Sequence, residues 1–144
     1  MATRNGSATW DGDLQTGKGS VTVGNGIFEG NFSFGTRFGD GEEGTNPEEL
    51  VAAAHAGCFT MALSAILGND GHTPEHLETK ARAQLRNIDG KPTITGMQLE
   101  TEGRVPGIDQ QQFEGYADQA KADCVISRAL AGVEEMTLKA TLAS

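Results

Sequence analysis

The 144 residues are the length of one compact domain, and we expect a single domain over residues 1–144. A content of 20 glycines with only 6% aromatic residues favours a turn-rich β or α+β fold over a helical bundle. The formal net charge of −9 argues against nonspecific binding to nucleic acid or to an anionic membrane, because both need a positive protein surface.

The N-terminal residues contain no apolar run of signal-peptide length, and we expect no later segment to span a bilayer. The sequence therefore predicts a cytoplasmic protein with neither a membrane nor a nucleic acid as partner.

Three strands are predicted at the start of the chain, over residues 7–14, 18–24 and 27–38. These segments are rich in β-branched or aromatic residues, and the motifs Gly-Lys-Gly and Gly-Asn-Gly separate them as turns. In the third segment the phenylalanines at 32, 34 and 38 are separated by even numbers of residues. A strand would therefore point Arg37 to the face opposite those rings.

A long helix is predicted to begin at Pro47, with Thr45 or Asn46 as its N-cap. Residues 50–67 are almost all apolar or small and show no polar face, so we expect this helix to be buried on most sides. A chain of this length has too few other residues to cover such a helix alone. The helix therefore predicts a homodimer with a large shared core.

The second half of the chain predicts a hairpin, two helices and a final strand. The hairpin strands are expected over 77–88 and 93–105, joined by an Asp-Gly-Lys-Pro turn. An amphipathic helix is predicted over 107–123, with Phe113, Tyr116 or Ala117, and Ala120 on its apolar stripe. A short helix begins after Cys124, and a strand ends the chain. The order βββ-α-ββ-αα-β predicts an α+β fold with mainly antiparallel sheets.

The two cysteines, Cys58 and Cys124, are the residues best suited to chemistry. Because cytoplasmic thiols are kept reduced, a permanent structural disulfide is not expected. The pair is therefore either two buried free cysteines or a reversible redox couple. His55 precedes Cys58 by three residues on the same helical face, where an imidazole can polarise the thiol, although packing in a dimer core is the preferred interpretation for His55. Cys124 stands at a helix start, where free N–H groups favour a thiolate.

Other cysteine chemistries fit the sequence less well. There is no Cys-x-x-Cys motif of a thioredoxin-type site. His55 and Cys58 would supply only half of a zinc site, and His72 and His76 have no neighbouring cysteine, so no metal is expected. The chain also lacks a phosphate loop and a dinucleotide-binding fingerprint.

Several longer segments are familiar: ATWDGDLQTGKGSV, TRF, GTNPEELVAAAHAGCFTMALS, VPGID and AKADCVIS. Over nearly the whole chain they resemble the osmotically inducible protein C branch of the OsmC/Ohr family of peroxidases. The resemblance implies an α+β fold whose mainly antiparallel sheets wrap around central helices in an intertwined homodimer. It also implies thiol-dependent reduction of organic hydroperoxides in oxidative and osmotic stress defence. No metal, haem or other cofactor is implied, but an external dithiol is needed, which in the family is a lipoylated protein or another dithiol.

The resemblance also assigns roles to four residues. Cys58 corresponds to the peroxidatic cysteine and Cys124 to the resolving one, so that a sulfenic acid on Cys58 condenses with Cys124 to a disulfide. Arg37 corresponds to the active-site arginine, which favours the thiolate and stabilises charge on the leaving oxygen. Glu48 corresponds to its partner, which orients the guanidinium through a charge-assisted pair.

Helix geometry limits how Glu48 and Cys58 can cooperate. Ten residues of a straight helix correspond to about 15 Å of rise and roughly 80° of rotation, so the two side chains cannot share a site on one unbroken helix. We therefore expect either that Glu48 precedes the regular helix or that the site is assembled across the dimer interface.

An apolar lining is the expected source of substrate preference. The candidate wall residues are Phe32, Phe34, Phe38, Phe59, Met61 and Met97. Such a wall favours peroxides with a hydrophobic body over hydrogen peroxide. The alternatives to an enzyme are a peroxide sensor, or a stress-related binding protein, with little turnover.

Overall fold

The computed structural model describes residues 2–39 and 42–144. The chain divides into two compact units, Met1–Leu50 and Val51–Ser144, and each is described by itself. The prediction of one domain over residues 1–144 stays a prediction.

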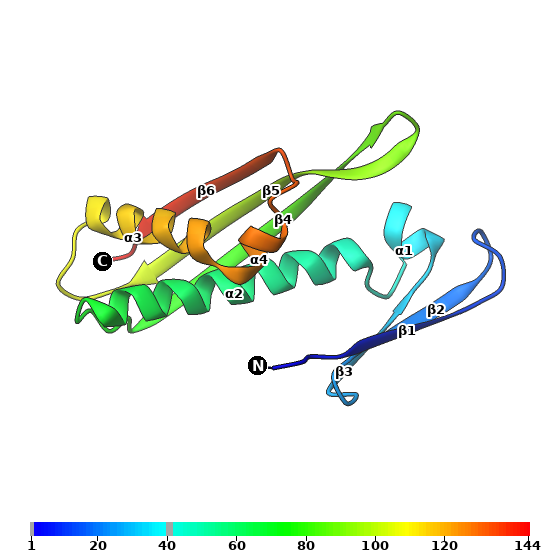
Figure 1. Cartoon of the computed structure of the whole chain (residues 1–144), viewed down its shortest axis with the longest axis horizontal. Helices are drawn as coiled ribbons and strands as arrows, with labels where there is room; N and C mark the ends of the chain where they lie inside the picture. The colour runs from blue at the N-terminus through cyan, green and yellow to red at the C-terminus, as the bar shows by residue number, and fades with distance from the viewer. Residues whose placement is uncertain (1, 40–41) are drawn as a thin grey trace. The chain divides into compact units, whose positions relative to one another are not determined.

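The first unit is built on a three-stranded antiparallel sheet (Figure 1). Its strands are β1 (Gly6–Asp11), β2 (Lys18–Val23) and β3 (Phe28–Phe32). On β2, a Cβ at Gly19 would come within 2.7 Å of the rings of both Trp10 and Phe32, whose centroids are 5.3 Å apart. A side chain at position 19 would therefore displace this aromatic pair.

The predicted third strand is wrong beyond Phe32, because the chain turns there into the short helix α1 (Phe34–Phe38). Ser33 is the N-cap: its Oγ accepts from Thr36 N at 3.2 Å, and its own N–H donates to Thr36 Oγ1 at 2.8 Å. This reciprocal capping box satisfies two backbone N–H groups that would otherwise lack a partner at a helix start. It fixes a helical turn where a strand was expected.

Helix α2 (Pro47–Asn69) begins as predicted, with Pro47 at its first position. Asn46 is the N-cap, since its Oδ1 accepts from Glu49 N at 2.8 Å. Glu48 is the second residue of the helix, so the expectation that it might precede the regular helix is wrong.

The second unit combines a mixed sheet with helices on one face (Figure 1). The sheet order is β4 (His76–Ile88), β5 (Lys91–Arg104), β6 (Glu135–Leu142), with β4 antiparallel and β6 parallel to β5. Asp89 and Gly90, both with positive φ, form the tight turn between β4 and β5. Between β5 and β6 lie α3 (Gln110–Asp123) and α4 (Val125–Ala129). Three of the four strand pairings are antiparallel, and the predicted α+β class is confirmed.

The core of the second unit lies between this sheet and helices α2 and α3. Its buried members are Phe59, Leu63 and Leu67 from α2, Leu99 from β5, Val105 after it, Phe113, Ala117 and Ala120 from α3, and Cys124. The other sheet face is polar, with exposed Lys80, Glu100 and Lys139. One thiol of the proposed redox pair is thus part of the main core.

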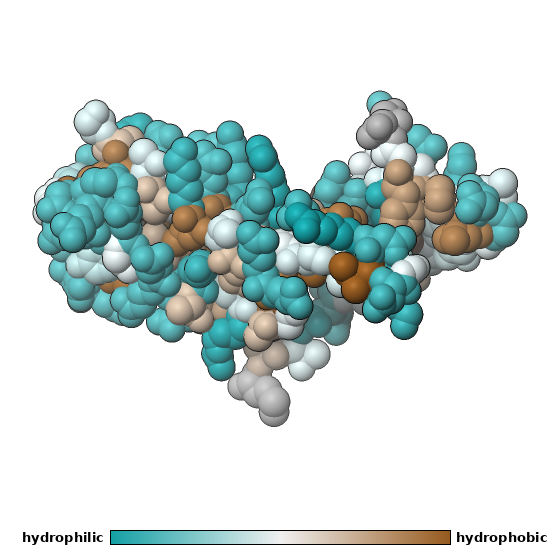
Figure 2. Space-filling view, turned by 90° about the horizontal axis from the view of Figure 1, so that it is seen from above, coloured by the Kyte–Doolittle hydropathy of each residue, from teal (hydrophilic) through white to brown (hydrophobic). Residues whose placement is uncertain are grey.

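Helix α2 is less covered than its sequence led us to expect. Only 28% of its most apolar 18-residue stretch is buried, and Met61 is 77% exposed. By length and composition alone such a helix could cross a membrane, but core helices of soluble proteins pass the same test. The space-filling view shows hydrophobic patches between larger hydrophilic areas (Figure 2). Burial on most sides is therefore not achieved within one chain.

Candidate active site

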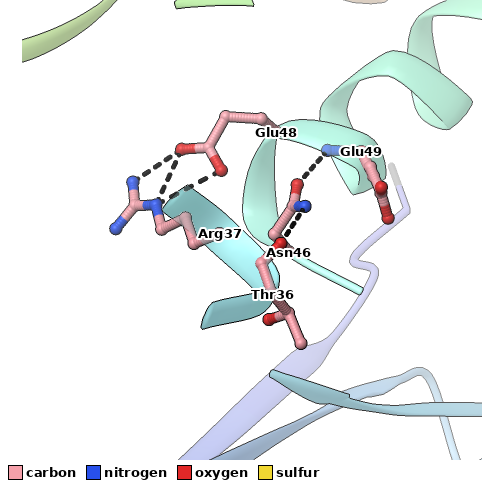
Figure 3. Close-up of polar contacts among 5 residues, drawn as sticks. All are labelled: Thr36, Arg37, Asn46, Glu48 and Glu49. Carbon is pink, nitrogen blue, oxygen red and sulfur yellow. Dashed lines mark hydrogen bonds and ion pairs between the residues drawn. The ribbon is translucent and has the colours of Figure 1, made fainter. Parts of the chain in front are cut away.

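Arg37 and Glu48 form a bidentate ion pair between α1 and the first turn of α2 (Figure 3). Arg37 Nη2 donates to Glu48 Oε1 at 2.6 Å, and Nε donates to Oε1 at 2.9 Å and to Oε2 at 3.2 Å. The Glu48 side chain is only 9% exposed, against 39% for Arg37. Charge-assisted hydrogen bonds from two guanidinium nitrogens to both carboxylate oxygens fix the plane of the guanidinium as well as its position.

Asn46 connects the two helices that carry this pair. Its Nδ2 donates to the carbonyl oxygen of Thr36 at 2.9 Å, while its Oδ1 caps α2 (Figure 3). Asn46 is itself buried. One side chain therefore ties the turn that bears Arg37 to the turn that bears Glu48. The sequence identified Asn46 only as a possible cap, and its contact with Thr36 has no sequence signal.

Arg37 also borders an apolar pocket of the first unit. The pocket, of about 280 Å³, is lined by Trp10, Leu14, Phe32, Ser33, Phe34, Arg37 and Phe38. The Arg37 guanidinium carbon lies 5.1 Å from the centroid of the Phe38 ring, within cation–π range. The prediction that Arg37 faces away from these rings is wrong, because it assumed a strand where α1 forms.

The thiols of Cys58 and Cys124 are both free, and Cys58 packs against the buried cluster to which Cys124 belongs. Cys58 lies at the middle of α2 and is half-buried, whereas Cys124 is buried between α3 and α4. Cys124 ends α3 and is the N-cap of α4, where its Sγ accepts from Ser127 N at 3.4 Å.

The surroundings of the two thiols set their pKa values in opposite directions. Burial raises the pKa of Cys58, and the hydrogen bond to Cys124 adds to this increase. Burial also opposes ionisation of Cys124, but hydrogen bonds from the N–H and the hydroxyl of Ser127 and from Cys58 outweigh it and lower its pKa. The resting pair therefore favours negative charge on Cys124, as predicted for a thiol at a helix start.

His55 is fully buried within the chain and its Nε2 lies 2.8 Å from Ser127 Oγ. Burial lowers the pKa of His55, which keeps the imidazole neutral. The sequence analysis missed Ser127. Its signal was the Cys124-x-x-Ser127 spacing, which matches the separation between an N-cap and the third helical residue.

No group of three or more histidine, cysteine, aspartate or glutamate side chains that could hold a metal ion occurs among residues 2–39 and 42–144. The candidate side chains are an arginine–glutamate pair in the first unit, and two thiols, one imidazole and one hydroxyl in the second.

The model of the OsmC-like protein family matches residues 39–139, more than half of the chain. The chain belongs to this family. The resemblance inferred from its motifs is confirmed.

Two curated relatives of this OsmC-like chain show the range of similarity. Peroxiredoxin OsmC of Escherichia coli is 45% identical over 142 residues, which covers 98% of this chain and 97% of that protein. An organic hydroperoxide resistance protein of Xanthomonas axonopodis is 33% identical over 101 residues, 69% of each chain.

Solved structures show the same fold as this OsmC-like chain. An OsmC protein of Legionella pneumophila has a TM-score of 0.75 at 23% identity and covers all of both chains. The organic hydroperoxide resistance protein OhrB of Bacillus subtilis has a TM-score of 0.73 at 24% identity, with 96% of this chain and 98% of that one covered.

The four predicted site residues of the OsmC-like chain lie in two groups. Arg37 contacts Glu48 in the first unit, and Cys58 packs against the core cluster that contains Cys124 in the second. The roles assigned to these four residues stay predictions.

Proposed function

We propose that this OsmC-like protein is a cysteine-based peroxidase that reduces organic hydroperoxides to alcohols in oxidative and osmotic stress defence. The observation that carries the proposal is the pair of free thiols, Cys58 and Cys124, of which the first packs against the core cluster that contains the second. Two of its relatives are named a peroxiredoxin and an organic hydroperoxide resistance protein, which supports the same chemistry.

The cycle balances with these two thiols and one external dithiol. The Cys58 thiolate attacks the terminal oxygen of R–O–O–H, the O–O bond breaks, and the alkoxide takes up a proton to leave as R–OH. Cys58 becomes a sulfenic acid. The sulfur of Cys124 then attacks that of Cys58, the S–O bond breaks, and water leaves as the disulfide forms. An external dithiol reduces the disulfide and is itself oxidised to a disulfide.

Arg37 stabilises the negative charge on the leaving alkoxide in this proposal, and Glu48 orients Arg37. Both Glu48 and Cys58 belong to α2, ten residues apart, which corresponds to about 15 Å along a helix. We therefore propose that the arginine–glutamate pair of one subunit serves the thiols of the other in a homodimer. The poorly covered face of α2 supports such a dimer.

The pocket beside Arg37 supports a substrate with a hydrophobic body. Three of the candidate wall residues, Phe32, Phe34 and Phe38, line it together with Trp10 and Leu14. Of the other wall candidates, Phe59 and Met97 are fully buried and Met61 is exposed on α2. An apolar wall stabilises an alkyl or aryl group but gains little from hydrogen peroxide.

The proposed enzyme works without metal, haem or another prosthetic group, in the cytoplasm, with neither nucleic acid nor membrane as partner. Its reductant is a dithiol, for which a lipoylated protein is the candidate that the family suggests. The alternative to this enzyme is a peroxide sensor or stress-binding protein, in which the same disulfide forms once without turnover.

The experiment that tests the proposal follows consumption of an organic hydroperoxide, and separately of hydrogen peroxide, with excess dithiothreitol. Wild type is compared with Cys58→Ser and Cys124→Ser. We expect wild type to consume the organic peroxide catalytically. The Cys58→Ser substitution should abolish this consumption. Consumption of one equivalent per chain would favour the sensor, and no consumption with both thiols reduced would contradict the proposed function.

A further inference from the structure

We propose that Ser127 and His55 are positioning residues for the resolving step: His55 orients the Ser127 hydroxyl, and that hydroxyl holds the Cys124 sulfur ready to close the disulfide. The proposal rests on the proposed peroxidase, because it assigns residues to the step in which Cys124 attacks the sulfenic acid of Cys58. Neither residue touches the peroxide in this account.

The three groups form one buried chain of contacts between α2 and α4. His55 is 0% exposed, Ser127 6% and Cys124 2%. His55 Nε2 lies 2.8 Å from Ser127 Oγ, and Ser127 N donates to Cys124 Sγ at 3.4 Å. A buried histidine and serine in an otherwise apolar core cost stability unless their polar atoms are paired. Their position beside Cys124 supports a role in its chemistry.

The unpaired ring nitrogen of His55 sets the direction of these hydrogen bonds. His55 Nδ1 is buried and has no hydrogen-bond partner among the described residues. If Ser127 donated to Nε2, the imidazole proton would lie on Nδ1 and a buried N–H would stay unpaired. If the proton lies on Nε2, only an acceptor stays unpaired, which is the more common case in proteins. His55 therefore donates to Ser127 Oγ.

This direction leaves the hydroxyl hydrogen of Ser127 free to donate to Cys124 Sγ. In this proposal the Cys124 sulfur receives a hydrogen bond from the Ser127 hydroxyl in addition to the one from the Ser127 backbone N–H. Both favour the thiolate, in agreement with the lowered pKa of Cys124. Because His55 donates to Ser127 Oγ, the hydroxyl hydrogen does not point toward the imidazole and is available to the sulfur.

The contact with Ser127 should increase the rate of the resolving step by a modest factor. Lowering a thiol pKa by one unit gives up to about tenfold more thiolate, whereas nucleophilicity falls by roughly threefold, so the net gain is about threefold. Orientation of the sulfur adds to this gain, because attack on a sulfenic sulfur needs alignment with the breaking S–O bond. We expect Ser127→Ala to slow disulfide closure by roughly three- to tenfold.

A single-turnover experiment separates the two steps. Reduced protein is mixed with one equivalent of organic hydroperoxide. The loss of peroxide gives the first rate, that of sulfenic acid formation. Alkylation of the remaining thiols followed by mass spectrometry gives the second rate, that of disulfide closure. In Ser127→Ala we expect an unchanged first rate, slower disulfide closure, and more sulfenic acid trapped by dimedone. Ser127→Thr keeps the hydroxyl and should restore closure. His55→Leu should slow closure more than His55→Gln, which keeps a donor.

Thr101→Val is the matched control for the loss of a buried hydroxyl. Thr101 is 1% exposed, and its Oγ1 bonds Thr79 and the carbonyl oxygen of Glu78 instead of a cysteine. Thr101→Val should leave the rates of peroxide loss and of disulfide closure unchanged. Closure at the wild-type rate in Ser127→Ala, or equal slowing in Thr101→Val, would overturn the proposal.

A second readout does not depend on peroxidase activity. In the Cys58→Ser background, thiolate absorbance near 240 nm reports the ionisation of Cys124 alone. We expect Ser127→Ala to move this titration to higher pH and Ser127→Thr to move it less. If wild type consumes no peroxide but the titration shifts as expected, the proposed function fails while the contact chain stands. If Ser127→Ala leaves the titration in place, the positioning role is refuted.

Discussion

At the scale of single residues, the Arg37–Glu48 pair is the contact most open to measurement. Arg37→Met removes the guanidinium from a carboxylate that is only 9% exposed. Because Arg37 itself is 39% exposed, solvent screens part of the pair, and we expect a loss of about 1–2 kcal/mol in the free energy of unfolding. The double variant Arg37→Met/Glu48→Gln should recover part of this loss, because no buried charge is left unpaired.

Urea unfolding of wild type, both single variants and the double variant gives the coupling energy of this pair. Equal losses in Arg37→Met and in the double variant would mean that the carboxylate is solvated, contrary to its burial. Turnover of the organic hydroperoxide should fall in both single variants if the pair acts in the proposed site.

His55 predicts a dependence of stability on pH. Its pKa in the folded chain is lowered by burial, so below about pH 6.5 the unfolded chain binds a proton that the folded chain does not. The free energy of unfolding should therefore fall as the pH drops below this value, by up to about 1.4 kcal/mol per pH unit. Denaturant unfolding between pH 7.5 and about 5.5 measures the slope.

His55→Gln lacks this titration and is the comparison for the same measurement. Its stability should depend less on pH than that of wild type over the same range. Parallel slopes in the two proteins would show that His55 is protonated in the folded chain or is open to solvent.

Sequence reasoning at this scale found residue types better than their contacts. Cys124 was placed correctly at a helix start, and Asn46 was one of two caps named. The contacts of Asn46 with Thr36 and of Ser127 with His55 were not predictable, because each joins segments whose approach depends on tertiary packing. A single sequence records spacing within an element, but it does not record which buried polar groups meet across elements.

At the scale of elements, the main difference between the sequence prediction and the structure lies at α1. The even spacing of Phe32, Phe34 and Phe38 matches a strand, but Phe34 and Phe38 are also four residues apart, which matches one turn of a helix. The spacing Ser33-x-x-Thr36 decides between them, since both side chains cap the turn. The two rings, with centroids 5.1 Å apart, lie on one side of α1 beside Arg37.

Removal of the cap should therefore affect both stability and the site. Ser33→Ala loses the side-chain acceptor for Thr36 N, and we expect a cost of about 1 kcal/mol. A helix of five residues has no reserve of further turns, so Arg37 should lose its fixed position and peroxide turnover should fall. Ser33→Thr keeps a capping hydroxyl and should preserve both.

Thermal unfolding and steady-state turnover, measured on the same samples, check this prediction. Unchanged turnover in Ser33→Ala with a lowered melting temperature would show that α1 does not position Arg37.

At the scale of the whole molecule, the predicted burial of helix α2 depends on what covers the apolar surface that a single chain leaves exposed. The apolar run of residues 50–67 predicted a helix buried on most sides, but only 28% of its most apolar stretch is buried in one chain. Composition identifies an apolar surface without showing what covers it. The proposed homodimer would cover this exposed surface. It would also bring Glu48 of one subunit to Cys58 of the other, although the two are ten residues apart on α2.

Subunit mixing tests whether the proposed site is shared between subunits. Arg37→Ala and Cys58→Ser are each expected to be inactive as homodimers. In a mixed dimer, Cys58 of the first variant can use Arg37 of the second, so one of two sites is intact. Random mixing at equal amounts should restore about one quarter of wild-type turnover, because half of the dimers are mixed.

The alternative gives a clearly different result. If each site uses Arg37 and Cys58 of the same subunit, both sites of a mixed dimer lack one of these residues and no turnover returns. Exchange of subunits must be shown separately, for example by mass spectrometry of differently tagged chains. Mixed dimers without activity would disprove the shared site but would not contradict the proposed peroxidase. Recovered turnover would require the arginine of one chain to act on the thiol of the other.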